Sequence, residues 1–275
     1  EHTLLQSASA GTPIFKMTSD AREVGRIDLH ISRATGAVES IDWQIITVTS
    51  QMDEDGRVAA VVNEYEKQLS VELDKPLGTT AVALDARQST SRSRETNLGS
   101  FIADSYRKWA GADVAIINGG SIRSNTTYGP GTLTKRDAFS VLPFENHVVK
   151  FVATGAQLRA ALEHGVSRVS ESAEEGRFPQ DTSLEITYDA RRPAGTRVTQ
   201  VSVGGRPLDD KKTYTVASNA YLVGGGDGYT MFGNARFLLD PEEGPVEAVV
   251  LMDAIQAARE IAPQTDGRIK RLDEK

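Results

Sequence analysis

The sequence contains no cysteine, which excludes disulfide bonds and thiolate metal sites. The missing cysteines do not indicate a redox compartment in either direction. No apolar run approaches the ~18 residues of a membrane-spanning helix, and no basic and apolar secretion signal opens the chain. The first residue is Glu1 rather than methionine, so we expect a fragment or a processed product of a longer protein.

Catalytic constellations are also missing. No Ser-His-Asp or Cys-His set can be assembled, and His147 and His164 lack metal-ligand spacing with each other or with nearby carboxylates. We expect both histidines to be ordinary surface or core residues. The sequence therefore offers no conventional catalytic set within this chain.

The bulk composition is that of a folded, acidic protein. The 275 residues carry a net charge of −7, and 39% of them are hydrophobic, enough for one large domain or a domain with an appendage. The acidity argues against binding to nucleic acid polymers, but local arginines can still hold a small anion. Predicted strands and helices are mixed without regular βαβ alternation, so we expect an α+β fold built on mixed sheets.

The first quarter of the chain predicts strands followed by one long helix. Strands are expected at residues 13–16, 25–31 and 38–48, with a turn at Thr35-Gly36. Apolar residues at helical spacing predict a helix over 53–73, which Lys75-Pro76 ends.

Further elements follow from periodicity along the remaining chain. Strands are expected at 80–84, 114–117, 148–152, 184–188, 198–203, 214–217 and 267–272. Helices are expected at 97–110, 134–142, 155–169 and 245–261, the first capped by Thr96 or Asn97.

One loop stands out, Tyr221-Leu-Val-Gly-Gly-Gly-Asp-Gly-Tyr229. We expect Gly224, Gly225 and Gly226 to let the backbone take positive φ and approach a ligand closely, and Gly228 belongs to the same loop. Asp227 is then presented on a tight turn between aromatic residues, which suits a flat, hydroxylated ligand. A flexible glycine turn with a solvated acid is the alternative.

Five segments, in order along the chain, resemble the C-terminal domain of the 5'-nucleotidase family, secreted or periplasmic two-domain enzymes that hydrolyse nucleotides. They are Ser91-Arg-Ser-Arg-Glu-Thr-Asn-Leu-Gly99, Asn118-Gly-Gly-Ser-Ile-Arg123, Val141-Leu-Pro-Phe144, Gly176-Arg-Phe-Pro-Gln180 and Gly224-Gly-Gly-Asp-Gly228. The resemblance covers nearly all of residues 76–275. It implies a remnant of a metallophosphoesterase domain at 1–49, a linker helix at 50–75, and a substrate-binding domain at 76–275.

The resemblance also implies roles for individual residues. Phe144 and Tyr221 match the positions that stack the nucleobase, and Asp227 matches the acid that holds the ribose. Arg92 and Arg123 match positions that hold the phosphate or line its route, and Arg94 is a weaker candidate. Two amides complete the expected substrate-binding set, Asn118 at an active-site asparagine and Asn146 at a spacing found in bacterial relatives.

The family's chemistry uses two divalent metal ions that lie in the other domain. His2 matches one of the histidines at those metals, so we expect it to be a ligand only in the full-length enzyme. We expect no cofactor in this chain and no hydrolysis from it alone. The resemblance further implies a periplasmic or extracellular location and a nucleoside or nucleotide as the bound partner.

Other functions remain open at this point. A relative that acts on 2',3'-cyclic nucleotides and 3'-nucleotides is a close alternative, although the Gly-Gly-Gly-Asp-Gly loop favours the 5' interpretation. A sulfur-oxidation hydrolase shares the two-domain plan. A noncatalytic ligand-binding or partner-docking module is an alternative of a different class, and Phe144, Tyr221 and Asp227 argue against it.

Overall fold

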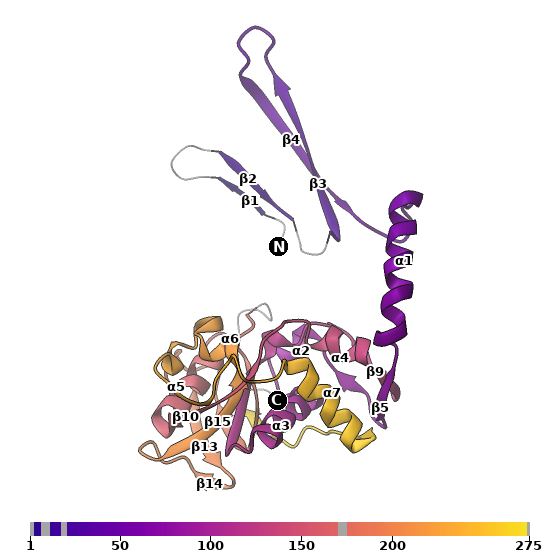
Figure 1. Ribbon diagram of the computed structural model, residues 1–275. Helices are drawn as coiled ribbons and strands as arrows, with labels where there is room; N and C mark the ends of the chain where they lie inside the picture. Colours follow the sequence, from indigo (N-terminus) through magenta and orange to yellow (C-terminus); the bar gives the residue numbers. More distant parts are fainter. Residues whose placement is uncertain (1–2, 7–11, 18–20, 170–174, 274–275) are drawn as a thin grey trace. The chain divides into compact units, whose positions relative to one another are not determined.

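A computed structural model describes residues 3–6, 12–17, 21–169 and 175–273. The chain divides into two compact units, Glu1–Lys67 and Gln68–Lys275. The boundary falls within the long helix α1 (Gly56–Leu73), so the chain passes from one unit to the other inside a helix (Figure 1).

The first unit consists of two antiparallel strand pairs and the beginning of α1. Strands β1 (Thr3–Gln6) and β2 (Pro13–Lys16) form one pair, and β3 (Glu23–Ile31) and β4 (Val38–Thr47) form the other. Gly36 takes a φ of +70° in the turn between β3 and β4, a conformation that costs glycine little. The Asp55 carboxylate accepts hydrogen bonds from the backbone N–H groups of Arg57 and Val58, which caps α1.

A five-stranded mixed sheet forms the centre of the second unit. Its order is β11 (Pro179–Thr182), β7 (Val114–Asn118), β15 (Thr213–Asn219), β10 (Val148–Thr154) and β16 (Arg236–Leu239). The β7–β15 pair is parallel, and the other three pairs are antiparallel.

Two apolar clusters cover the two faces of this sheet. Alternate residues of β7 enter different clusters: Ala115 and Ile117 join one, while Val114 and Ile116 join the other. Helices α3 (Asn97–Ala110) and α7 (Glu247–Ala258) contribute to the first cluster, and α5 (Gly155–Gly165) contributes to the second (Figure 1). Because β7 is buried on both faces, it reads in the sequence as an uninterrupted apolar run.

Smaller sheets and short helices complete the unit. The sheets are β14–β13–β12–β18 (Arg206–Pro207, Val198–Val203, Leu184–Tyr188, Ile269–Arg271), β17–β5–β9 (Glu260–Ile261, Pro76–Thr80, Gly131–Thr134) and β6–β8 (Leu84–Asp85, Thr127–Tyr128). The remaining helices are α2 (Gln88–Ser91), α4 (Lys135–Val141) and α6 (Ala220–Val223), with 3₁₀ turns at Gly119–Ser121, Gly226–Gly228 and Thr230–Phe232.

The predicted α+β class with mixed sheets is confirmed. Several element boundaries differ from the sequence prediction. Residues 81–83 are not in a strand, and β5 and β6 flank them instead. Helix α5 ends at Gly165 rather than at 169, and α7 ends at Ala258 because Arg259 has a φ of +63° and directs the chain into β17.

Candidate functional site

The cavity that concerns function lies where β7 and β15 end. Because these strands are parallel neighbours, their carboxyl ends lie at the same edge of the sheet, and they carry Asn118 and Asn219. The cavity has a volume of about 370 Å³, within the rough range of 300 to 1,000 Å³ found for small-molecule sites. It is lined by Arg92, Asn118, Gly120, Ser121, Arg123, Phe144, Asn146, Gly176, Tyr221 and Asp227.

All seven predicted substrate-binding residues therefore line one cavity, although four separate stretches of chain supply them. Arg94 does not line it, and its backbone carbonyl instead accepts a hydrogen bond from Gln180. His2 lies outside the described residues.

Buried amides and a hydroxyl hold the strand ends together. Asn118 is 2% exposed, and its Oδ1 accepts hydrogen bonds from Ser121 Oγ at 2.5 Å and Asn219 Nδ2 at 3.3 Å. Asn219 is fully buried; its Nδ2 also donates to Ser121 Oγ, and its Oδ1 accepts from the Leu222 N–H at 2.9 Å. The contact with the Leu222 N–H caps α6, so Asn219 fixes both the strand ends and the start of the Tyr221 loop.

Asp227 is held from three directions. Its Oδ2 accepts from Asn118 Nδ2 at 2.7 Å, and its Oδ1 accepts from the Tyr221 hydroxyl at 3.0 Å. The Tyr221 oxygen in turn accepts from the Asp227 N–H at 3.2 Å, and His164 Nε2 lies 2.8 Å from the Asp227 carbonyl oxygen. These contacts stabilise Asp227 in the left-handed region at a φ of +51°.

The prediction that the consecutive glycines of the Tyr221 loop take positive φ is partly wrong. Of Gly224, Gly225 and Gly226, only Gly225 has a positive φ, +95°, while Gly224 is at −70°. Gly228 has a positive φ of +86°, and Asp227 itself takes the conformation expected of a glycine. Gly226 is instead required by space, since a Cβ there would lie 2.5 Å from the Tyr221 ring.

The exposed part of the lining is aromatic. Phe144 and Tyr221 each expose 45% of their surface, and both line the cavity. The guanidinium carbon of Arg123 lies 5.6 Å from the centroid of the Phe144 ring, within cation–π range. Burial and the hydrogen bond to Asp227 raise the pKa of Tyr221, so its hydroxyl stays protonated at neutral pH.

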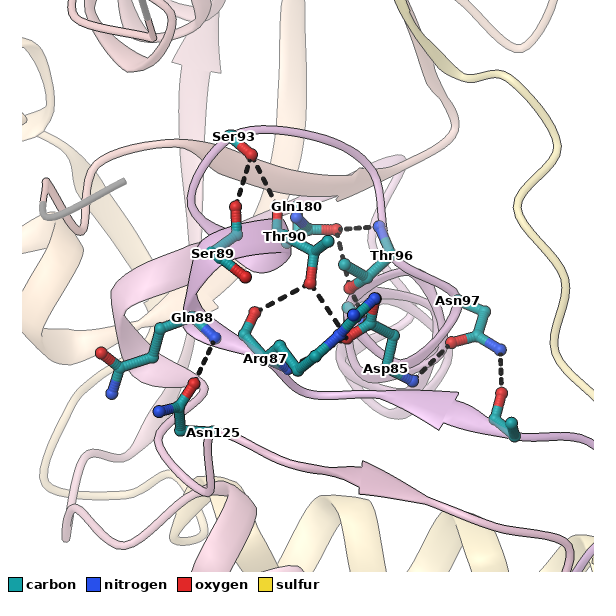
Figure 2. A network of polar contacts seen from close by, with 12 residues as sticks. Asp85, Arg87, Gln88, Ser89, Thr90, Ser93, Thr96, Asn97, Asn125 and Gln180 are labelled. Carbon is teal, nitrogen blue, oxygen red and sulfur yellow. Dashed lines mark hydrogen bonds and ion pairs between the residues drawn. The ribbon is translucent and has the colours of Figure 1, made fainter. Parts of the chain in front are cut away.

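A dense set of polar contacts fixes the backbone on both sides of Arg92 (Figure 2). Before it, Asp85 accepts from the Arg87 N–H and guanidinium and from Thr90 Oγ1. The Gln180 side chain accepts from the Thr96 N–H and donates to the carbonyls of Ser91 and Arg94, which lie on either side of Arg92. The loop that carries Arg92 is therefore a rigid support.

One buried acid lies behind the cavity. Glu247, in the first turn of α7, is fully buried, and its carboxylate accepts from the Tyr106 hydroxyl at 3.1 Å and from Asn146 Nδ2 at 3.3 Å. Burial raises its pKa to about 7, against the lowering effect of hydrogen bonds from Asn146, Tyr106 and Asn219.

Sequence reasoning missed several residues of this arrangement. Ser121 and Gly176 lie inside segments that were recognised, and Asn219 lies two residues before Tyr221, so the same motifs could have indicated them. Glu247 has no local signal, because only the packing of α7 against α3 and the 142–147 segment brings it near. His164, predicted to be an ordinary histidine, contacts the Asp227 carbonyl but lies in no metal-like cluster.

Two other cavities have the wrong lining for a stacked ligand. They measure about 680 and 610 Å³, and the described residues that line them include no phenylalanine, tyrosine or tryptophan. No group of three or more His, Cys, Asp or Glu residues in the described ranges could hold a metal ion. Across the same ranges, every helix is too short or too polar to cross a membrane.

Comparison with known proteins gives a consistent result. Residues 76–234 match the family model of the 5'-nucleotidase C-terminal domain. The trifunctional nucleotide phosphoesterase protein YfkN of Bacillus subtilis is 30% identical over 261 residues, 90% of this chain and 17% of its own length. The mouse 5'-nucleotidase is 31% identical over 244 residues, 82% of this chain and 42% of its own length.

Among solved structures, the 5'-nucleotidase precursor of Thermus thermophilus superposes with a TM-score of 0.78 and 28% identity. The superposition covers all of this chain and 55% of that one. The chain thus spans about half the length, or less, of the relatives it matches.

Proposed function

Since this chain belongs to the family of 5'-nucleotidase C-terminal domains, we propose that its cavity binds the nucleoside part of a nucleotide for hydrolysis elsewhere in a longer enzyme. The observation that carries this proposal is the lining itself. Two half-exposed aromatic side chains, an oriented carboxylate and two arginines surround one cavity of nucleoside size.

Phe144 and Tyr221 hold the base by stacking. An exposed aromatic ring offers a flat apolar face, and stacking contributes about 1 to 3 kcal/mol per base with little discrimination among bases. Neither ring is needed to fill a core, because each remains 45% exposed.

Asp227 holds the ribose. Among the residues that the structure describes, each of its carboxylate oxygens has one partner, Tyr221 at Oδ1 and Asn118 at Oδ2, and each can accept a further hydrogen bond. Two acceptors at the spacing of a carboxylate match the two hydroxyls of a vicinal diol. Arg92 and Arg123 then hold the phosphate or line its route, since guanidinium groups bind phosphate oxygens in pairs.

The chemistry of hydrolysis belongs to the part of the enzyme outside this chain. We assign the two divalent metal ions to that part, because the described residues offer no metal-ligand cluster. The assignment of residues 1–49 to the metallophosphoesterase domain, of 50–75 to a linker and of 76–275 to substrate binding is part of the same proposal. So are a periplasmic or extracellular location and the absence of hydrolysis by this chain alone.

The proposal is tested by calorimetric titration of this chain with adenosine and AMP. We expect saturable binding with a Kd between roughly 10 µM and 1 mM, about −4 to −7 kcal/mol. Tyr221→Ala and Asp227→Ala should each weaken binding at least about tenfold, because each removes a direct contact.

Tyr65→Ala and Asp253→Ala are matched controls, since both side chains are exposed and neither lines the cavity. Unchanged binding in both cavity variants would reject the site. Absence of binding by the wild-type chain would reject a self-sufficient nucleoside site and favour the noncatalytic module. Kinetics of the longer enzyme on 5'-AMP and 3'-AMP would separate the 5' function from the 3' and cyclic alternative.

A further inference from the structure

Glu247 is a buried acid to which the proposed function gives no role. It is fully buried yet lies one hydrogen bond from Asn146, a residue of the cavity lining. The backbone repeats this connection, since the Glu247 N–H donates to the Asn146 carbonyl at 2.8 Å. Asn146 is therefore attached to Glu247 through both its main chain and its side chain.

The same carboxylate reaches the other side of the cavity. The Asn219 amide is among the hydrogen-bond donors that lower the pKa of Glu247, and Asn219 Nδ2 also contacts Asn118 Oδ1. Asn118 in turn donates to Asp227 at 2.7 Å. One carboxylate thus lies behind the segments that carry Phe144 and Asp227.

We infer that Glu247 is a positioning residue for the cavity, whose carboxylate determines which end of the Asn146 amide faces the ligand. The inference rests on the proposed function and on the place of Asn146 in the lining of the nucleoside cavity. When Glu247 is ionised it only accepts hydrogen bonds, so the Asn146 amide turns Nδ2 toward it and leaves Oδ1 for the ligand. When Glu247 is protonated, one of its oxygens becomes a donor, and the opposite orientation of the amide becomes competitive.

The side chains that contact Glu247 do not change charge near neutral pH, whereas Glu247 itself does. Tyr106 of α3 has a pKa raised well above its usual value by burial, so it remains a neutral donor. Asn146 and Asn219, from the two other segments packed against it, are uncharged amides. The nearby His147 directs its Nδ1 to the Pro241 carbonyl at 2.6 Å. Because burial brings the Glu247 pKa to about 7, the change falls in an accessible pH range.

The direct test needs no ligand. In the ¹⁵N-labelled wild-type chain, the side-chain NH₂ resonances of Asn146, assigned from their loss in Asn146→Asp, should shift with pH along one titration near neutrality. In Glu247→Gln this titration should disappear. An Asn146 amide insensitive to pH in the wild type, or equally sensitive in Glu247→Gln, would overturn the inference.

The second test connects Glu247 to binding. Adenosine affinity of the wild type should be about three- to tenfold higher at pH 8 than at pH 6, because the ionised carboxylate accepts all three side-chain donors at once. Glu247→Gln should remove this dependence and bind about fivefold more weakly at pH 8, since its amide offers one acceptor oxygen in place of two.

Glu243→Gln is the matched control, an exposed glutamate four residues earlier with the same loss of charge. It should retain both the affinity and its pH dependence. If Glu247→Gln does not fold, the wild-type pH series still decides, because a pH-independent Asn146 amide contradicts the inference. If the wild type fails to bind adenosine at either pH, the proposed function fails, while the amide titration still tests Glu247.

Discussion

Two groups of side chains form and support the cavity. They differ in how much of their surface and hydrogen-bonding capacity remains available to a ligand. The amide network, defined as Asn118, Ser121, Asn219 and Glu247, is almost fully buried, and its polar groups are engaged with one another and with neighbouring backbone. The aromatic pair, Phe144 and Tyr221, leaves 45% of each side chain exposed. The polar groups of the network therefore form their hydrogen bonds within the protein. The aromatic pair retains exposed surface that a ligand can contact.

This contrast separates stability from binding. Removal of a network member leaves buried donors or acceptors unmet, which costs stability as well as site geometry. Removal of an aromatic group at the surface costs contact with the ligand and little else. The following changes, from the largest expected effect to the smallest, test the separation.

Asn219→Ala should reduce the free energy of unfolding by about 2 to 4 kcal/mol, because it removes the cap of α6 and the buried donor that Asn118 Oδ1 and Ser121 Oγ both accept from. Urea denaturation measures the loss, and adenosine binding should fall with it. The exposed Asn234→Ala is the control and should stay within about 0.5 kcal/mol of wild type. A loss under about 1 kcal/mol would mean that the network does not support the fold.

Asp181→Val should act in the opposite direction. Asp181 is as buried as the network, but neither carboxylate oxygen has a hydrogen-bond partner among the described residues, and its cross-strand neighbour Ile116 belongs to an apolar cluster. Valine suits a buried strand and should raise stability by about 1 to 3 kcal/mol at pH 7. A destabilised variant would show that the carboxyl group has a structural partner.

The pH dependence of this gain has a definite sign. Burial raises the Asp181 pKa well above its usual value, so above pH 4 the folded chain keeps a proton that the unfolded chain has released. The contribution of Asp181 to stability therefore falls as the pH rises, and the advantage of valine should be larger at pH 7 than at pH 4. Denaturation of both proteins at the two pH values measures the difference.

Phe144→Ala should weaken adenosine binding about tenfold, the equivalent of one lost stacking contact, while stability changes by less than about 0.5 kcal/mol. Phe139→Ala is a matched control, since Phe139 is 40% exposed and does not line the cavity. Titration and denaturation of the same samples give both quantities. A large loss of stability in Phe144→Ala would contradict the division between the two groups.

Tyr221→Phe tests the Tyr221 hydroxyl oxygen, which connects the aromatic pair to Asn118 of the network through Asp227. The ring and its stacking are kept, but Asp227 loses the hydroxyl that contacts both its carboxylate and its N–H. We expect adenosine affinity to fall about three- to fivefold, the effect of one hydrogen bond that orients the acid. Equal affinity of wild type and variant would show that Asn118 and His164 suffice to hold Asp227.

The sequence predicted most of the central sheet, because β7, β10 and β15 are continuous apolar or alternating runs. It did not predict β11, where Pro179–Thr182 holds mainly polar residues and pairs with β7 only through tertiary packing. The end of α7 was also placed too far along, since nothing local indicates that Arg259 adopts a positive φ.

For the site, motifs indicated the residues that line the cavity but not those that support it. Phe144 follows a proline, Asp227 lies between two glycines, and Tyr221 lies three residues before Gly224, which drew attention to them. Glu247 and His164 lie within helices of ordinary composition, and their proximity to the cavity depends on how those helices pack. Contacts between residues distant in sequence leave no short-range pattern to read.

The parallel pairing of β7 with β15 also has a consequence during synthesis. The hydrogen bond from Ser218 Oγ to the Ile116 carbonyl joins residues 102 positions apart, and Glu247 lies further along still. Contacts of such separation form late, because the intervening chain must first be brought together. As the chain leaves the ribosome, Phe144 and Arg92 emerge well before the residues that complete their cavity. The lining is therefore complete only after Asp227 has emerged and β15 has paired with β7.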